Sequence, residues 1–270
     1  MIEIQNLFVC LVEPSNLQAN FITKNLNQIG IAHVGRVKNG AAAIKTLDDD
    51  VVPDVVMSAM YLPDMTGTDL IFAIRQHSSQ SSMPFILISS ETDQRNLEDV
   101  RQAGTIAILP KPFDSSKLLS SVQNVLNFLN AEDDRDEFGD QKISSLKVLL
   151  VDDSHVARKH IRSVLERLGF QNFTEAVDGK DAIPHIERTL FDLVVTDYYM
   201  PNLDGLGLTD YIRNRSIQSS VPILMVTTIR DEDRLTAVRN AGVSAICDKS
   251  FEINLVRDLV KEFILDADHD

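Results

Sequence analysis

The chain carries one sequence pattern twice, and this internal repeat limits the fold more than any other feature. Residues 8–15, FVCLVEPS, correspond to residues 147–154, KVLLVDDS, and residues 37–44, VKNGAAAI, correspond at the same separation to AVDGKDAI. Three further pairs continue the correspondence: PDVVMSAMYLP with FDLVVTDYYMP, MPFILISS with VPILMVTT, and AILPKPF with AICDKSF. A repeat of roughly 125 residues has the size of a whole domain rather than of a solenoid unit.

The repeat divides the 270 residues into two domains of one fold. We expect these domains at residues 1–130 and 146–270, joined by residues 131–145. The joining segment, AEDDRDEFGDQKISS, is acidic and poor in apolar residues, which is typical of a linker.

Each copy alternates short, apolar, β-branched runs with amphipathic stretches, which indicates strands that alternate with helices. In the second copy, strands are expected near residues 147–151, 173–176, 192–196, 222–227 and 244–247, with helices between them and a last helix near 252–265. Near-continuous apolar strands that helices cover form parallel sheets. The predicted fold class is α/β: two doubly wound, five-stranded, parallel-sheet (flavodoxin-like) domains in tandem.

Charge and composition argue against several classes of protein. The formal net charge is −14, and neither half has the basic footprint of a nucleic-acid-binding protein. The chain has no apolar run of about eighteen residues, and its first residues, MIEIQNLFVC, lack a secretory pattern. We therefore expect no membrane contact and a cytoplasmic location. Cys10 and Cys247 have neither a second cysteine nor a histidine nearby, which argues against zinc.

Polar residues stand where the predicted strands of the second copy end. Asp152 and Asp153 follow the first strand, and Asp197 follows the third. Thr227 ends the fourth strand, and Lys249 follows the fifth. Because the carboxyl ends of parallel strands meet at one edge of a sheet, we expect these five side chains to converge. The set suits magnesium and a phosphoryl group, with Asp197 as the nucleophile.

A structural explanation exists for each of these residues taken alone. An Asp-Asp pair after a strand is more often a helix cap, and Ser154 fits that role. A lone threonine or lysine at a strand end carries almost no information. The positions of all five residues at the ends of successive strands favour a functional site.

Both halves resemble the receiver domains of bacterial two-component response regulators, of the type exemplified by the chemotaxis regulator. In the second copy, VDDS, TDYYMPNLDG, VTT and DKSF match the family's motifs in order and spacing. The resemblance implies that Asp197 accepts phosphate from a histidine kinase or a histidine phosphotransfer protein. It implies that Thr227 and Lys249 engage the phosphoryl oxygens. It also implies a Mg2+ site made of Asp152, Asp153, Asp197 and the backbone carbonyl of Tyr199.

The second copy departs from the family at two positions. Ser250 follows Lys249 where the family usually has proline, whereas the first copy keeps proline after Lys111. The family's aromatic switch position, three residues before the lysine, holds Ile246, so an aromatic flip at this position is not expected.

The first copy lacks most of the residues that this chemistry needs. Its corresponding residues are Glu13 and Pro14 for the acidic pair, Ala59 for the acceptor, Ser89 for the hydroxyl and Lys111 for the lysine. Alanine cannot be phosphorylated, and strand alternation should turn the neighbouring Ser58 away from the site. The first half therefore resembles a pseudo-receiver, which is either a docking or dimerisation module or a decayed copy.

The resemblance favours a phosphorylation-controlled signalling protein that is not an enzyme and that acts through contacts with another protein. Its downstream partner is unknown, a homodimer is possible, and no DNA-binding output domain is expected. One alternative is a phosphate sink or scaffold. Another is a Mg2+-dependent phosphohydrolase of the dehalogenase type, which would carry a second acid two residues after the nucleophile, where this chain has Tyr199.

Overall fold

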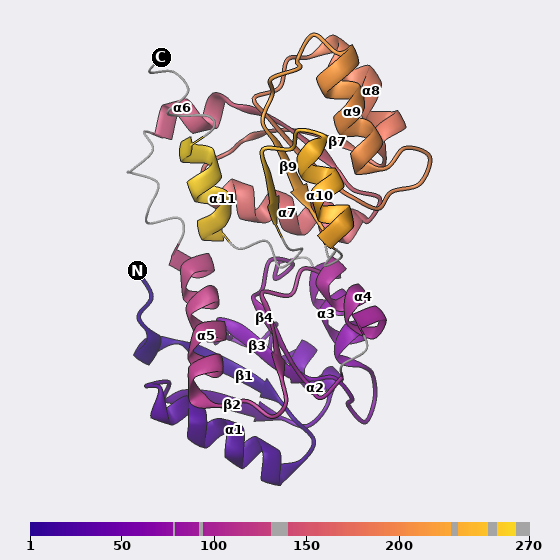
Figure 1. Ribbon diagram of the computed structural model, residues 1–270. Coiled ribbons are helices and arrows are strands. Elements are labelled where there is room, and N and C mark those ends of the chain that lie inside the picture. Colours follow the sequence, from indigo (N-terminus) through magenta and orange to yellow (C-terminus); the bar gives the residue numbers. More distant parts are fainter. Residues whose placement is uncertain (78, 92–93, 131–139, 228–231, 248–252, 263–270) are drawn as a thin grey trace. The chain divides into compact units, whose positions relative to one another are not determined.

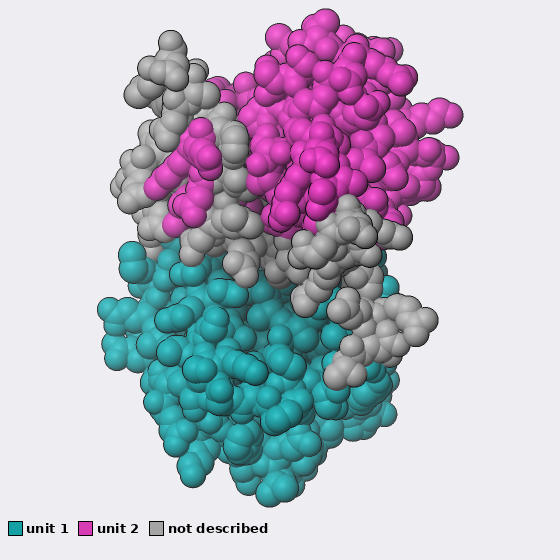
Figure 2. Space-filling view, in the orientation of Figure 1, with its two compact units in different colours: residues 1–130 teal, residues 131–270 magenta. Residues whose placement is uncertain are grey.

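A computed structural model of the chain places two compact units, residues 1–130 and 131–270 (Figures 1 and 2). The structure describes residues 1–77, 79–91, 94–130, 140–227, 232–247 and 253–262. Each unit is described separately below. Among the described residues, no helix is long and apolar enough to cross a membrane.

The first unit is built on a five-stranded sheet with the order β2-β1-β3-β4-β5, in which all paired strands are parallel. Its strands are β1 (Phe8–Val12), β2 (His33–Val37), β3 (Val55–Ala59), β4 (Phe85–Ser89) and β5 (Ala107–Pro110). Its helices are α1 (Asn16–Gln28), α2 (Gly40–Lys45), α3 (Gly67–Gln76), α4 (Gln94–Gln102) and α5 (Ser115–Asn130), after a short 3-10 turn, η1 (Ile4–Asn6). Helix α1 packs against α5, and α3 packs against α2 and α4, so helices cover both faces of the sheet (Figure 1).

The second unit repeats this sheet with the equivalent order β7-β6-β8-β9-β10, again with parallel pairs. Its strands are β6 (Lys147–Val151), β7 (Asn172–Ala176), β8 (Leu193–Asp197), β9 (Ile223–Val226) and β10 (Ala245–Cys247). Its helices are α7 (His155–Arg167), α8 (Gly179–Arg188), α9 (Gly205–Arg215), α10 (Glu232–Asn240) and α11 (Ile253–Val260). The prediction of two doubly wound, five-stranded parallel sheets is confirmed.

The central strands form the core of each unit because helices bury them on both faces. Every residue of β3, β4 and β8 is buried, whereas the edge strand β2 keeps exposed positions. A strand that is buried on both faces can expose functional groups only where it ends. The sheet therefore places the site residues at its carboxyl edge.

An arginine near the end of α3 and another near the end of α9 bind main-chain carbonyls of their own units, and the sequence analysis did not identify them. The first is buried and the second is partly buried. In the first unit, Arg75 donates from Nε to the carbonyl of Ala103 at 2.9 Å and from Nη2 to that of Gly104 at 2.7 Å. Burial lowers the pKa of Arg75 to about 10. Arg213 occupies the matching position on α9 and donates from Nε to the carbonyl of Gly242 at 2.8 Å. The two copies thus share an arginine that binds main-chain carbonyls and lies outside the residues of the candidate site.

Part of the expected linker is ordered structure. Residues Asp140–Ser145 form helix α6, and the side chain of Ile143 within it is 2% exposed. The Nδ2 of Asn172 donates to the carbonyl of Ser144 at 2.7 Å. The end of this acidic segment therefore packs on the second unit, while residues 131–139 lie outside the described residues.

Candidate functional site

Three carboxylates meet at the carboxyl edge of the second sheet. Asp152 and Asp153 follow β6, Asp197 ends the neighbouring strand β8, and one ligand oxygen from each lies within 4.8 Å of the others. We call these three residues the acidic cluster. Asp152 and Asp197 are 1% and 2% exposed, whereas Asp153 is exposed. Three carboxylates this close repel one another unless a cation lies among them.

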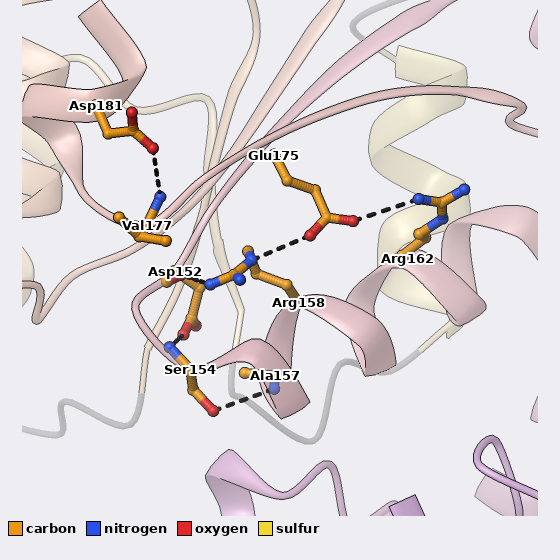
Figure 3. Close-up of polar contacts among 8 residues, drawn as sticks. All are labelled: Asp152, Ser154, Ala157, Arg158, Arg162, Glu175, Val177 and Asp181. Atoms are coloured by element: carbon orange, nitrogen blue, oxygen red, sulfur yellow. Dashed lines mark hydrogen bonds and ion pairs between the residues drawn. The ribbon is translucent and has the colours of Figure 1, made fainter. Parts of the chain in front are cut away.

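Three hydrogen bonds hold Asp152, two at its main chain and one at its carboxylate. Its N–H donates to the carbonyl of Ala176 at 3.3 Å, and its Oδ1 accepts from the N–H of Ser154 at 2.8 Å. Its carbonyl accepts from Nη1 of Arg158 at 2.6 Å (Figure 3). Ser154 also accepts from the N–H of Ala157 at 3.3 Å and so caps α7. The helix cap and the acidic pair therefore coexist in this loop.

Asp197 is fixed by the turn that follows it. Its Oδ1 accepts from the N–H of Tyr198 at 2.7 Å, and its carbonyl accepts from the Oγ1 of Thr196 at 3.0 Å. At Gly205, the first residue of α9, a Cβ atom would lie 2.1 Å from that carbonyl. Only glycine allows the helix to start this close to the strand end.

Thr227 lies beside Asp197 at the same edge of the sheet. It follows β9, whose last residue, Val226, is the register partner of Asp197. Its side chain is 3% exposed, and its N–H donates to the carbonyl of Cys247, the last residue of β10. The structure thus places Thr227 where the sequence predicted it. Lys249 and Ser250, with the bond between them, lie outside the described residues.

The loop after Asp197 carries two adjacent tyrosines, of which Tyr199 is exposed. Tyr199 is 49% exposed, and its ring lies edge-on to that of Tyr198 with centroids 4.7 Å apart. Further along the loop, Asn202 adopts a left-handed conformation with φ of 60°, and its Nδ2 donates to Oδ2 of Asp178. The hydrogen bonds from Asn202 and from the N–H of Asp181 lower the pKa of Asp178. Asp178 thereby ties this loop to the start of α8.

In the first unit an ion pair occupies the matching edge. Oε2 of Glu13 lies 3.3 Å from Nζ of Lys111, and the amino group of Lys111 also bonds Oε1 of Gln18. Glu13 is 5% exposed, and its other oxygen, Oε1, accepts from the N–H of Ser15 at 3.0 Å. The residues that correspond to the acid and the lysine of the second copy therefore bond each other.

The hydroxyl groups near Ala59 are also engaged. Ser58 is fully buried, and its Oγ donates to the carbonyl of Ala59 at 2.9 Å. The Oγ of Ser89 accepts from the N–H of Glu91 at 2.9 Å. Thr196 makes the same bond to the carbonyl of Asp197 that Ser58 makes to the carbonyl of Ala59. The hydroxyl of Ser58 therefore has a structural role common to both copies and points away from the acceptor position.

Comparison with known proteins identifies the family. The response regulator receiver domain matches the chain twice, at residues 9–123 and 148–261, and the chain belongs to this family. Among curated relatives, the chemotaxis protein CheY of Pseudomonas aeruginosa is 33% identical over 117 residues, which are 43% of this chain and 94% of that protein. The chemotaxis protein CheY-3 of Vibrio cholerae is 36% identical over 107 residues, which are 40% of this chain and 82% of that protein.

Solved structures include two examples of interest. One is the receiver domain of a sensor histidine kinase from Pseudomonas aeruginosa, with a magnesium ion coordinated in its active site cleft. It is 28% identical to this chain with a TM-score of 0.42, and the match covers 44% of this chain and 97% of that structure's chain. A probable two-component system response regulator/GGDEF domain protein has 20% identity and a TM-score of 0.42 and covers 98% of this chain and 100% of its own. The two matches to the receiver family, at residues 9–123 and 148–261, show tandem receiver domains, which are signalling modules.

Proposed function

We propose that the chain is a phosphorylation-controlled response regulator whose second receiver accepts a phosphoryl group on Asp197. The observation that carries this proposal is the convergence of the acidic cluster, with its oxygens within 4.8 Å of one another, at the end of a sheet of the receiver family. The donor is a histidine kinase or a histidine phosphotransfer protein, which is the class of partner that receiver domains use.

Asp197 acts as the nucleophile. A carboxylate oxygen attacks phosphorus, an oxygen–phosphorus bond forms, and the bond from phosphorus to the donor's imidazole nitrogen breaks, with its electron pair going to that nitrogen. The hydroxyl group of Thr227 donates a hydrogen bond to one phosphoryl oxygen, and the ammonium group of Lys249 forms an ion pair with another.

The acidic cluster fits a magnesium site. Its hard carboxylate oxygens come from two adjacent strand ends, and two of its three carboxylates are almost fully buried, so a dication offsets their repulsion. We assign the ligands to Asp152, Asp153, Asp197 and the carbonyl of Tyr199. A bound Mg2+ would supply charge neutralisation for the phosphoryl oxygens.

The first receiver takes no part in phosphoryl transfer. Ala59 offers no nucleophile, and Glu13 is already paired with Lys111 at 3.3 Å. We propose that it is a pseudo-receiver that serves as a docking module, and that phosphorylation of the second receiver changes the contacts of the protein with a partner protein. This output requires no contact with nucleic acid, consistent with the net charge of −14.

Intact-mass spectrometry tests the proposal. The protein is incubated with acetyl phosphate, with and without Mg2+, as wild type and as Asp197→Ala. We expect a mass gain of one phosphoryl group that requires Mg2+ and disappears in the variant. An equal gain in the variant, or repeated turnover of unrelated phosphate esters, would contradict the proposal, and the second result would indicate a phosphohydrolase.

A further inference from the structure

A chain of charged side chains starts at Asp152, one member of the acidic cluster, and runs along α7 (Figure 3). Arg158 on α7 lies between the β6–α7 loop and Glu175 on β7, and its Nε pairs with Oε2 of Glu175 at 3.1 Å. Arg162, one turn later on α7, pairs through Nη1 with Oε1 of the same carboxylate at 3.3 Å. One glutamate thus joins two arginines on one face of the helix.

Arg158 connects this network to the site. Its Nη1 donates to the carbonyl of Asp152 at 2.6 Å, while its Nε is held by Glu175. The side chain of Arg158 is 10% exposed, its bond to the Asp152 carbonyl is buried, and its bond to Glu175 is partly buried. The two bonds together fix the guanidinium plane. Oδ1 of Asp152 accepts from Ser154, which fixes the carboxylate in the same loop. The orientation of Asp152 therefore depends on a residue outside the acidic cluster.

The first unit lacks every member of this network. Ala19, Thr23 and Arg36 stand at the positions of Arg158, Arg162 and Glu175. The charge of the β-strand residue is reversed, and Arg36 instead donates to Oδ1 of Asn20 at 2.8 Å. The network and the acidic cluster thus occur together in one copy, although the helix and strand that would carry the network are present in both. The shared fold alone does not require these three residues.

We propose that Arg158 is a positioning residue for magnesium binding, with Glu175 holding its guanidinium in place. This inference rests on the proposed function, because it assigns the acidic cluster to a metal. Arg158 holds the Asp152 carbonyl and so sets the direction in which the Asp152 carboxylate points. Groups behind the ligands of a metal commonly set its affinity in this way.

The negative charge of Glu175 explains its role beside Arg158. A buried cation beside three carboxylates would compete electrostatically with Mg2+ for them. The pairing with Glu175 offsets that charge and leaves Arg158 mainly its role as a donor. The guanidinium also fits because it can donate in two directions at once, which an ammonium group on a flexible stem does less well.

The test compares three substitutions in the full chain. Arg158→Met keeps the apolar stem and removes both donors, while Arg158→Lys keeps one charged donor. Arg162→Met is the matched control, because Arg162 contacts the same carboxylate but is more exposed than Arg158 and bonds Glu175 and Glu166 in place of Asp152. Calorimetric titration measures Mg2+ affinity directly, and urea unfolding without Mg2+ measures fold stability. The Mg2+ concentration for half-maximal phosphorylation is a third measurement.

We expect Arg158→Met to weaken Mg2+ binding by about tenfold, Arg158→Lys to weaken it less, and Arg162→Met to leave it unchanged. The half-maximal Mg2+ concentration should rise in the same order. If Arg158→Met does not fold, the Mg2+ affinities of Arg158→Lys and Arg162→Met are compared instead, and only Arg158→Lys should bind Mg2+ more weakly than the wild type. Equal Mg2+ affinity in a folded Arg158 variant and the wild type would overturn the inference, as would an equal loss in Arg162→Met.

These outcomes separate the inference from the proposed function. If the wild type binds Mg2+ but takes no phosphoryl group from the donor, the proposed function is wrong. The Mg2+ affinities of the wild type and the Arg158 variants then still test the positioning role of Arg158. If the wild type is phosphorylated and the Arg158 variants need no more Mg2+ than it does, only the inference fails.

Discussion

Asp197 and Ala59 end equivalent strands, and this single difference separates the two receivers most sharply. Each is 7% exposed or less, and the carbonyl of each accepts a hydroxyl bond from the preceding residue. The backbone geometry at the acceptor position is thus kept in both copies. The two copies differ here in their side chains, because Glu13 and Lys111 of the first copy form an ion pair with each other.

Tyr199 should slow the loss of the phosphoryl group. Hydrolysis needs a water placed in line with phosphorus, and a half-exposed ring two residues after Asp197 offers bulk at the rim of the site. Ile229, two residues after Thr227 in the sequence, lies outside the described residues and has no polar group to orient water. We expect Tyr199→Asn combined with Ile229→Glu to speed the decay roughly tenfold. Decay is followed by mass after donor removal, and a decay rate no faster than that of the wild type would contradict the prediction.

Asp178 should make stability depend on pH. Its pKa is held below the ordinary value of 3.8, so the folded state favours its ionised form. The resulting stabilisation is present above that value and is lost as the pH falls through the lower folded pKa. We expect Asp178→Ala to lower the free energy of unfolding by about 1 kcal/mol at neutral pH, because the cap of α8 is lost.

Urea unfolding of wild type and variant between pH 7 and pH 3 measures this effect. The difference between the two proteins should shrink toward the acid end of the series, as the pH falls toward the lowered pKa of Asp178 in the folded state. A constant difference across the series would show that the charge of Asp178 contributes nothing.

Each unit carries an arginine in the last turn of the helix that follows its third strand, Arg75 on α3 and Arg213 on α9. Arg75 is buried and donates to four main-chain carbonyls, those of Ser81, Met83, Ala103 and Gly104. We expect Arg75→Met to lower the free energy of unfolding of the first unit by about 3 kcal/mol, because buried carbonyls lose their donor. The exposed Lys45→Met should change it by less than about 0.5 kcal/mol. Hydrogen exchange followed by mass spectrometry reports each unit separately, and equal effects of the two substitutions would contradict this account.

Most helices and strands of the fold could be predicted from the sequence, because the spacing of apolar residues and the presence of turn-forming residues are local features of the chain. The strands β6 to β9 begin and end within about one residue of their expected positions, and Asp152, Asp197 and Thr227 follow from them. The bond from Arg158 to the Asp152 carbonyl could not be predicted, because an arginine on a helix usually faces solvent. Helix α6 was missed because Ile143 is an isolated apolar residue in an acidic segment.

At the scale of the whole molecule, the proposed function assigns phosphoryl transfer to the second receiver alone. Restoring the acceptor alone should therefore not restore the function. We expect Ala59→Asp to leave the protein with one phosphoryl group per chain, because Pro14 supplies no carboxylate and Lys111 remains paired with Glu13. Intact mass after treatment with acetyl phosphate and Mg2+ checks this, and a second phosphoryl group in the variant would contradict it.

The central claim is that a single residue, Asp197, carries the phosphoryl group. Borohydride reduces an acyl phosphate to an alcohol and so marks the acceptor permanently for peptide mapping by tandem mass spectrometry. After phosphorylation of the full chain with acetyl phosphate and Mg2+, the account predicts the mark at Asp197 and none in residues 1–130. A mark at Glu13 or at another carboxylate, with Asp197 unmodified, would contradict it.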